Sequence, residues 1–289
     1  MELVPIVVFD TSAINRLSKE QNWKGLIAAL HHAFYTRVLA TNFEEVAATV
    51  RSEERRELLV SVSRALLPGG DCILPFNWLL ELHVEEFEKN RAFYDWKNAP
   101  VCPPSLAHAL LHERGFFSKE LAAEQLAHAR QLQVQFEMPF DRIRPEFEKI
   151  FRRHRKRVDS FAEFRDVMFA PGGAYWAIGS ELYRHVAGSA PDEEKIRQFV
   201  AACPPFHALL IAYARAQYER CVAVQPAAKK KKLANRVDTF MAVYVPYCPQ
   251  FVTADDDQFQ CFSTVVSELK LSTSVLTYQQ FWNSMLIAA

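Results

Sequence analysis

Short runs of apolar, mostly β-branched residues lie near both ends of the chain, and polar residues follow each run directly. Four such runs occur, at residues 4–9, 37–40, 251–253 and 274–277. Buried strands that lead into helix starts have this pattern. Because strands that alternate with helices build parallel sheets covered by helices, the pattern predicts an α/β domain with a central parallel sheet.

The middle of the chain differs from both ends in composition and in the spacing of its apolar residues. It is rich in Leu, Ala, Glu, Arg, Gln and Phe, with apolar residues at helical spacing and almost no strand signal. The spacing predicts helices over residues 78–96, 104–114, 118–138, 144–168, 174–187 and 193–222. We therefore predict a large all-helical insertion or subdomain at residues 76–229, within an α/β core made of residues 1–75 and 230–289.

Composition sets few limits on function. The 34 basic residues balance the 34 acidic ones, so contacts with nucleic acid must come from local patches. The six cysteines form no Cys-x-x-Cys pair, which favours free thiols in a reducing compartment. The first residues lack the basic region of a secretion signal, and the uncharged stretches are too short to span a membrane. These features favour a cytoplasmic protein without a membrane partner.

Acidic residues follow several of the predicted strands. Asp10, Glu44 or Glu45, and Asp255 to Asp257 occupy such positions, and Asp238 interrupts the apolar face of a predicted helix. Ligands of an open α/β sheet bind beyond the carboxyl ends of its strands. Carboxylates that converge there repel each other unless a cation compensates, and oxygen ligands suit Mg²⁺ or Mn²⁺. Such ions promote hydrolysis of phosphodiester bonds by activating a bound water.

Each of these acids also has an ordinary structural interpretation. Asp10 could only cap a helix, although the hydroxyl residues that follow it could do the same. Asp238 could pair with Arg236 or Lys232 at the surface, but its apolar neighbours argue against that. The acidic run could be a solvated turn, which is the interpretation we keep for Asp256.

The chain resembles the PIN-domain nucleases in five segments, which cover residues 1–70 and 230–289. They are Phe9-Asp10-Thr-Ser-Ala-Ile-Asn15, Thr41-Asn-Phe-Glu-Glu-Val46, the helix carrying Asp238, Tyr247-Cys-Pro-Gln-Phe-Val-Thr-Ala-Asp255-Asp-Asp257, and Ser274-Val-Leu-Thr-Tyr-Gln-Gln-Phe281. The chain departs from the compact family pattern in the long separation of Glu45 from Asp238, which leaves the size of the substrate and its access to the site open.

The resemblance implies a three-layer α/β/α fold of Rossmann-like type with a cluster of catalytic carboxylates. It places one or two Mg²⁺ or Mn²⁺ ions among Asp10, Glu45, Asp238 and Asp255, with Asp257 as a supporting acid of the metal site. It also implies accessory roles for Thr253 and Asn15. The choice of Glu45 over Glu44 follows the family pattern, and a register shift of one residue stays an alternative.

Two basic runs could contact a phosphate backbone. The first comprises Arg152, Arg153 and Arg155 in the predicted insertion, and the second comprises Lys229, Lys230, Lys231 and Lys232. Runs of this kind are also common on solvated faces and flexible junctions. The lysines precede the helix that carries Asp238, so they could guide nucleic acid toward the acidic site.

Taken together, these features predict a metal-dependent endoribonuclease of PIN-like type, with DNA as a second possible substrate. Similar proteins include bacterial toxins, which are usually shorter and paired with an antitoxin. The insertion could serve a protein partner or a second copy of the chain. The alternative is a catalytically inactive PIN-like scaffold that uses the insertion as its partner surface, although an inactive site would be free to lose its four carboxylates.

Overall fold

The computed structural model describes residues 4–49, 52–67, 71–89, 99–105, 124, 160–189, 191–221 and 239–288. Within these ranges no single helix is long and apolar enough to cross a membrane. By length and composition, only the helical segments Glu193–Ala202 and Pro204–Glu219 pass such a test together, and that pair is bent by 107°.

A parallel sheet of five strands forms the centre of the molecule, in the order β3-β2-β1-β4-β5. The strands are β1 (Ile6–Phe9), β2 (Tyr35–Leu39), β3 (Cys72–Ile73), β4 (Gln250–Thr253) and β5 (Ser274–Thr277). The predicted α/β class with a central parallel sheet is therefore confirmed. The chain builds the sheet outward from β1 in one direction through β2 and β3, then returns to the other side of β1 to add β4 and β5.

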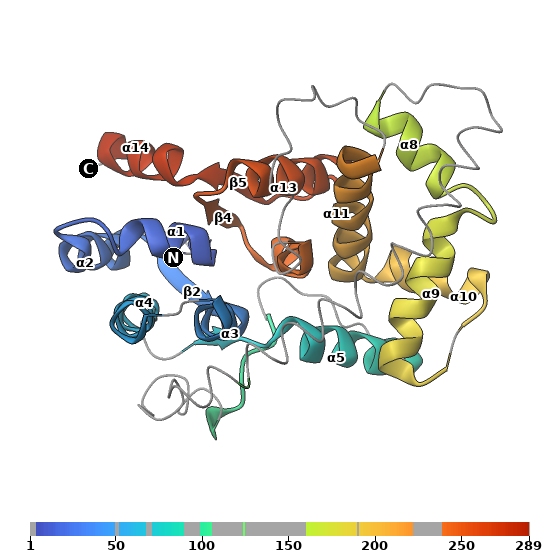
Figure 1. Ribbon diagram of the computed structural model, residues 1–289, viewed down its shortest axis with the longest axis horizontal. Helices are drawn as coiled ribbons and strands as arrows, with labels where there is room; N and C mark the ends of the chain where they lie inside the picture. Colours follow the sequence, from blue (N-terminus) through green and yellow to red (C-terminus); the bar gives the residue numbers. More distant parts are fainter. Residues whose placement is uncertain are drawn as a thin grey trace.

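Helices connect these strands. They are α1 (Thr11–Leu17) and α2 (Trp23–Ala33) after β1, α3 (Ala40–Thr49) and α4 (Glu53–Ala65) after β2, α13 (Asp256–Leu269) after β4, and α14 (Tyr278–Ala288) after β5. Figure 1 shows α1 to α4 and α14 on one side of the molecule. Because α1 and α13 each begin directly after a strand, the residues at both junctions lie at the carboxyl edge of the sheet.

Alternating strand residues enter two hydrophobic clusters, one on each face of the sheet. Packed with α1 to α4 and α14 are Val7, Phe9, Val38, Cys72 and Val252. Packed with the helices on the opposite face are Val8, Leu39, Ile73 and Phe251. The sheet is thus the middle layer of an α/β/α arrangement, as predicted.

The opposite face is covered largely by helices from the middle of the chain. They are α5 (Phe76–Glu88), α8 (Phe161–Met168), α9 (Ala174–Ala187), α10 (Glu193–Ala202) and α11 (Pro204–Cys221), followed by a short 3₁₀ helix, η3 (Met241–Tyr247). Helix α11 packs along α13 and η3, and its Phe206 and Leu209 are fully buried in the same cluster as Val8 and Phe251. The described helices of residues 76–221 therefore share a core with the sheet. The division into core and insertion stays a prediction.

Most helix boundaries in this region follow the predicted spacing. Helix α9 has the predicted bounds, and α5 covers residues 78–88 of the predicted 78–96 helix and ends before Lys89. The predicted helix at 193–222 is broken at Cys203 into α10 and α11, because Pro204 and Pro205 lack the backbone N–H that a continuous helix needs. The predicted helices between residues 106 and 159 lie outside the described residues, except for residue 124.

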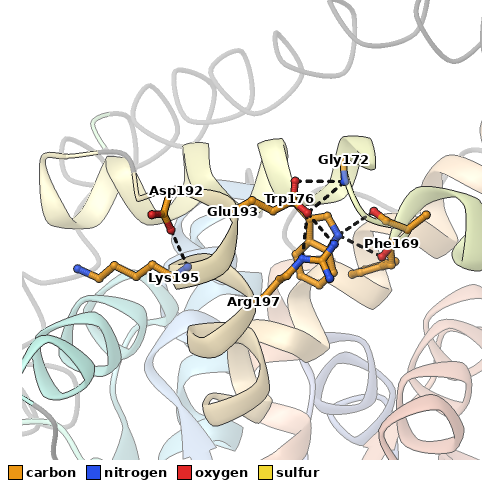
Figure 2. Close-up of polar contacts among 8 residues, drawn as sticks. Phe169, Gly172, Trp176, Asp192, Glu193, Lys195 and Arg197 are labelled. Carbon is orange, nitrogen blue, oxygen red and sulfur yellow. Dashed lines mark hydrogen bonds and ion pairs between the residues drawn. The ribbon is translucent and has the colours of Figure 1, made fainter.

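A polar network joins the turn after α8 to the start of α10, as Figure 2 shows. The Glu193 carboxylate accepts bonds from the Gly172 backbone N–H at 3.1 and 3.2 Å and from the Arg197 guanidinium at 2.6 and 2.9 Å. Arg197 also lies over the Trp176 ring, 4.7 Å from its centroid. The Trp176 indole N–H donates to the Phe169 carbonyl at 3.1 Å. Since Gly172 has a φ of +72°, a residue without a side chain suits this turn.

Candidate functional site

The candidate site lies where β1 and β4 pair, the point at which the order of strands along the chain changes direction. Asp10 directly follows β1, and its backbone N–H donates to the Val252 carbonyl of β4 at 3.0 Å. Thr253 ends β4, and Asp255 follows two residues later. Open α/β sheets bind ligands at such a switch point, beyond the carboxyl ends of the strands. Residues far apart in the sequence thus meet at the expected edge of the sheet.

Asp10 is nearly inaccessible to solvent, with 1% of its surface exposed. Its carboxylate caps α1 by accepting from the Ala13 backbone N–H at 2.6 Å. It also accepts from the Ser12 hydroxyl at 2.9 Å and from the Thr253 hydroxyl at 2.6 Å. Asp10 therefore does cap α1, as the structural interpretation predicts. The cap does not explain why the carboxylate is buried, because a helix cap can be exposed to solvent.

Burial raises the pKa of Asp10 to about 7. The hydrogen bonds from Thr253, Ala13 and Ser12 counteract the rise, whereas the nearby charge of Glu45 adds to it. A carboxylate removed from water loses hydration that its hydrogen bonds replace only in part. At neutral pH the site therefore holds a carboxyl group that is poised between its charged and neutral forms, which is common at functional sites.

Glu45 comes to this site from α3, which starts immediately after β2. Burial raises its pKa, and a hydrogen bond with Thr11 counteracts the rise. The neighbouring Glu44 interacts with a different residue. Burial raises the pKa of Glu44 to about 7. The pKa of Tyr244 is raised chiefly by its own burial, and the charge of Glu44 adds to that rise. Consecutive helical residues diverge in direction, and of the two it is the charge of Glu45 that acts on Asp10.

Asn42 connects the start of α3 to the end of β1 through a hydrogen bond. It is fully buried, and its side-chain amide donates to the Phe9 carbonyl at 2.8 Å. The Thr11 hydroxyl lies 3.4 Å from the Asn42 side-chain oxygen. These contacts fix the end of β1, which Asp10 follows, relative to the first turn of α3, the helix that carries Glu45.

Thr253 connects the two sides of the switch point. It is fully buried, donates to Asp10, and accepts from the Asp255 backbone N–H at 3.0 Å. Asp255 itself is exposed and caps α13, accepting from the Gln258 backbone N–H at 2.9 Å. Asp256 is exposed and Asp257 half-buried in the first turn of α13, where acidic side chains stabilise the helix dipole.

Asn15 was expected to line the same site. The structure places its side-chain oxygen against the Arg55 guanidinium of α4. The same guanidinium donates to the Asn15 carbonyl at 3.2 Å and to the Ser18 hydroxyl at 2.6 Å. Asn15 thus helps to join α1 to α4, and its accessory role at the site stays a prediction.

Several predicted residues lie outside the described part of the chain. They are Asp238, the lysines Lys229, Lys230, Lys231 and Lys232, and the arginines Arg152, Arg153 and Arg155. Among the residues that the structure describes, no group of three or more His, Cys, Asp or Glu side chains is placed to hold a metal ion. The contribution of Asp238 to the site and the path of nucleic acid stay predictions.

The described donors suit a divalent cation in their chemistry. Asp10 and Glu45 both offer carboxylate oxygens, the ligands that Mg²⁺ and Mn²⁺ prefer. Burial raises the pKa of both groups, so a positive charge beside them would relieve an unfavourable arrangement. The single Ser12 hydrogen is shared between both oxygens of Asp10, which leaves that carboxylate with spare capacity to accept. Further oxygens would have to come from residues such as Asp255 and Asp238.

Two polar residues of this site had not been predicted from the sequence. The Ser12 hydroxyl binds Asp10 and accepts from the Ala254 backbone N–H at 2.8 Å. The Gln258 side-chain oxygen lies 2.9 Å from the Thr253 hydroxyl. Ser12 is two residues from Asp10, so its proximity was visible in the sequence, but nothing in the sequence indicates that Gln258 faces inward.

Comparisons with known proteins returned nothing for this chain. It matches no protein-family model, no curated protein and no solved structure.

Proposed function

We propose that the protein is a metal-dependent endoribonuclease of PIN-like type that hydrolyses RNA phosphodiester bonds with Mg²⁺ or Mn²⁺. The observation that carries this proposal is the buried Asp10 carboxylate beside Glu45 at the switch point of the sheet. Keeping the buried Asp10 carboxyl group near a second, half-buried carboxyl group is unfavourable in the absence of a compensating cation. A helix cap alone would be served equally well by an uncharged Ser, Thr or Asn.

The residues of the chain have distinct roles in this proposal. Thr253, Ser12 and the Ala13 backbone N–H hold the Asp10 carboxylate in one orientation, and Glu45 supplies a second carboxylate. Asp238 and Asp255 complete the acidic set, and Asp257 supports it. A bound divalent cation would supply charge stabilisation and an activated water.

The proposed substrate is RNA, with DNA as the competing nucleic acid in any assay. The predicted contacts to its phosphates are the lysine run at residues 229–232 and the arginines at residues 152, 153 and 155, since such contacts supply most non-specific affinity. Helices α5 and α8 to α11, which cover the other face of the sheet from α1 to α4, are the proposed surface for a protein partner or a second copy of the chain. We place the protein in the cytoplasm, in keeping with the free thiols of the five cysteines whose side chains the structure describes.

Glu45 and Glu44 offer a matched pair for testing the proposal. Glu45→Gln should reduce Mn²⁺-dependent RNA cleavage by about 100-fold or more, because it removes a charge beside Asp10. Glu44→Gln should leave cleavage within about threefold of the wild type, because Glu44 lies beside Tyr244. Initial cleavage rates of the two variants, with thermal unfolding to confirm folding, provide the comparison. Equal losses in both variants would contradict the assignment of Glu45.

The same assay distinguishes the proposed nuclease from the inactive scaffold. A scaffold would show no Mn²⁺-dependent cleavage of RNA or DNA above the level of Asp10→Asn. It would also bind Mn²⁺ equally well with and without Asp255.

A further inference from the structure

Gln258 lies in the first turn of α13 with 2% of its surface exposed. Its side-chain oxygen Oε1 is 2.9 Å from the Thr253 hydroxyl. Its side-chain nitrogen Nε2 is fully buried and has no hydrogen-bond partner among the described residues. A buried N–H without an acceptor costs about 1 to 3 kcal/mol, so this carboxamide calls for an explanation.

The Thr253 hydroxyl has only one hydrogen, and three oxygens could accept it, those of Asp10, Gln258 and, at 3.2 Å, Ser12. Its oxygen lies 2.6 Å from Asp10 Oδ2 and 2.9 Å from Gln258 Oε1. A hydrogen bond to a charged carboxylate is the stronger of the two, so an ionised Asp10 takes the hydrogen. The Thr253 and Gln258 oxygens would then face each other at hydrogen-bond distance with no hydrogen between them, which is unfavourable.

A half-turn of the Gln258 carboxamide resolves this conflict. The oxygen and nitrogen ends of the amide have nearly the same shape, so the rotation needs no repacking. Nε2 then donates to the Thr253 hydroxyl, which also accepts from the Asp255 backbone N–H at 3.0 Å. With both acceptor positions of Thr253 filled, its hydrogen can no longer point to Gln258. Of the acceptors that remain, Asp10 Oδ2 at 2.6 Å is closer than the Ser12 hydroxyl at 3.2 Å and carries the charge.

We propose that Gln258 is a positioning residue of the Asp10 site. Its carboxamide donates to Thr253, directs the Thr253 hydrogen to Asp10, and so holds the Asp10 carboxylate in the orientation that binds the divalent cation. This inference rests on the proposed function. Residues that orient metal ligands through hydrogen bonds typically change metal affinity by about 10- to 100-fold when replaced.

Gln258→Met tests the proposal, because methionine has a similar length and no hydrogen-bond donor. Calorimetric titration with Mn²⁺ alone should show affinity weakened by about tenfold relative to the wild type. Gln260→Met is the matched control: Gln260 is exposed on the same helix, and this variant should keep wild-type affinity. Gln258→Leu serves as a second apolar replacement should the methionine variant fold poorly.

A double-variant comparison separates positioning from packing. If Gln258 acts through Thr253, Gln258→Met should cause no further loss of Mn²⁺ affinity in a Thr253→Val background. In a Thr253→Ser background, which keeps the hydroxyl, Gln258→Met should still show its full effect on Mn²⁺ affinity.

The outcomes distinguish this proposal from the one it rests on. Wild-type Mn²⁺ affinity in Gln258→Met, or additive losses with Thr253→Val, would overturn the role of Gln258 while leaving the nuclease proposal intact. A wild-type protein that shows no Mn²⁺ binding dependent on Asp10 would overturn both.

Discussion

Asp10→Asn is expected to reduce Mn²⁺-dependent RNA cleavage by about 1000-fold or more. The substitution keeps the size of the side chain and its capacity to cap α1, but it removes the charge at the centre of the proposed site. Initial rates on several single-stranded and structured RNAs, with Mg²⁺ and with Mn²⁺, measure the effect. Asp238→Asn should have a similar effect.

Asp256→Asn is the control for this comparison. Asp256 is exposed in the first turn of α13, three residues beyond Thr253, so its replacement should leave cleavage within about twofold of the wild type. If Asp10→Asn retains the wild-type rate across all metals and RNAs, any cleavage observed comes from another source and the proposed nuclease activity is wrong.

The same Asp10→Asn variant is expected to be more stable than the wild type at pH 8 in metal-free buffer. The pKa of Asp10 rises from its ordinary value of 3.8 to about 7 on folding, chiefly through burial. Between these pH values the folded protein keeps a proton that the unfolded chain releases, so the wild-type free energy of unfolding falls as pH rises. At about 1.4 kcal/mol per pH unit, the loss reaches about 4 kcal/mol above pH 7.

Urea unfolding of both proteins at pH 4 and pH 8, with a chelator present, measures this difference. Asn carries no charge, so the stability advantage of the variant should be largest at pH 8 and should shrink toward pH 4. Glu44 and Glu45 also have raised pKa values, but both variant and wild type retain them. A difference that does not change with pH would show that Asp10 is not the group responsible.

If Asp10→Asn loses cleavage activity and gains stability, the Asp10 carboxylate serves function at a cost to the stability of the fold. Groups that destabilise the fold in the absence of ligand are common where a protein binds charged partners. A merely structural cap would show neither the loss of activity nor the gain in stability, because Asn caps a helix about as well as Asp does.

Much of the sheet could be predicted from the sequence, because buried parallel strands are short apolar runs that end at polar residues. β5 has the predicted bounds, and β1 and β4 lie within about two residues of theirs. β3 was missed because it has only two residues, Cys72 and Ile73, too few to produce a periodic signal. β2 begins and ends earlier than predicted, and α3 starts at Ala40 without a separate capping turn.

The site was only partly predictable for a different reason. Strand ends indicate where Asp10 and Thr253 lie, and the topology of the sheet then brings them together. The sequence alone could not separate Glu44 from Glu45, since only the orientation of α3 decides which of them lies beside Asp10. The inward orientation of Gln258 likewise depends on how α13 packs, and that packing involves residues of α11.

Calorimetric titration of the metal-free protein with Mn²⁺ tests the proposed cation site most directly. The wild type should show saturable binding that Asp10→Asn abolishes and Asp255→Asn weakens by about tenfold or more. Asn caps a helix as well as Asp does, so Asp255→Asn should remove a ligand charge without unfolding α13. Equal heats and affinities in all three proteins would contradict a cation site at this edge of the sheet.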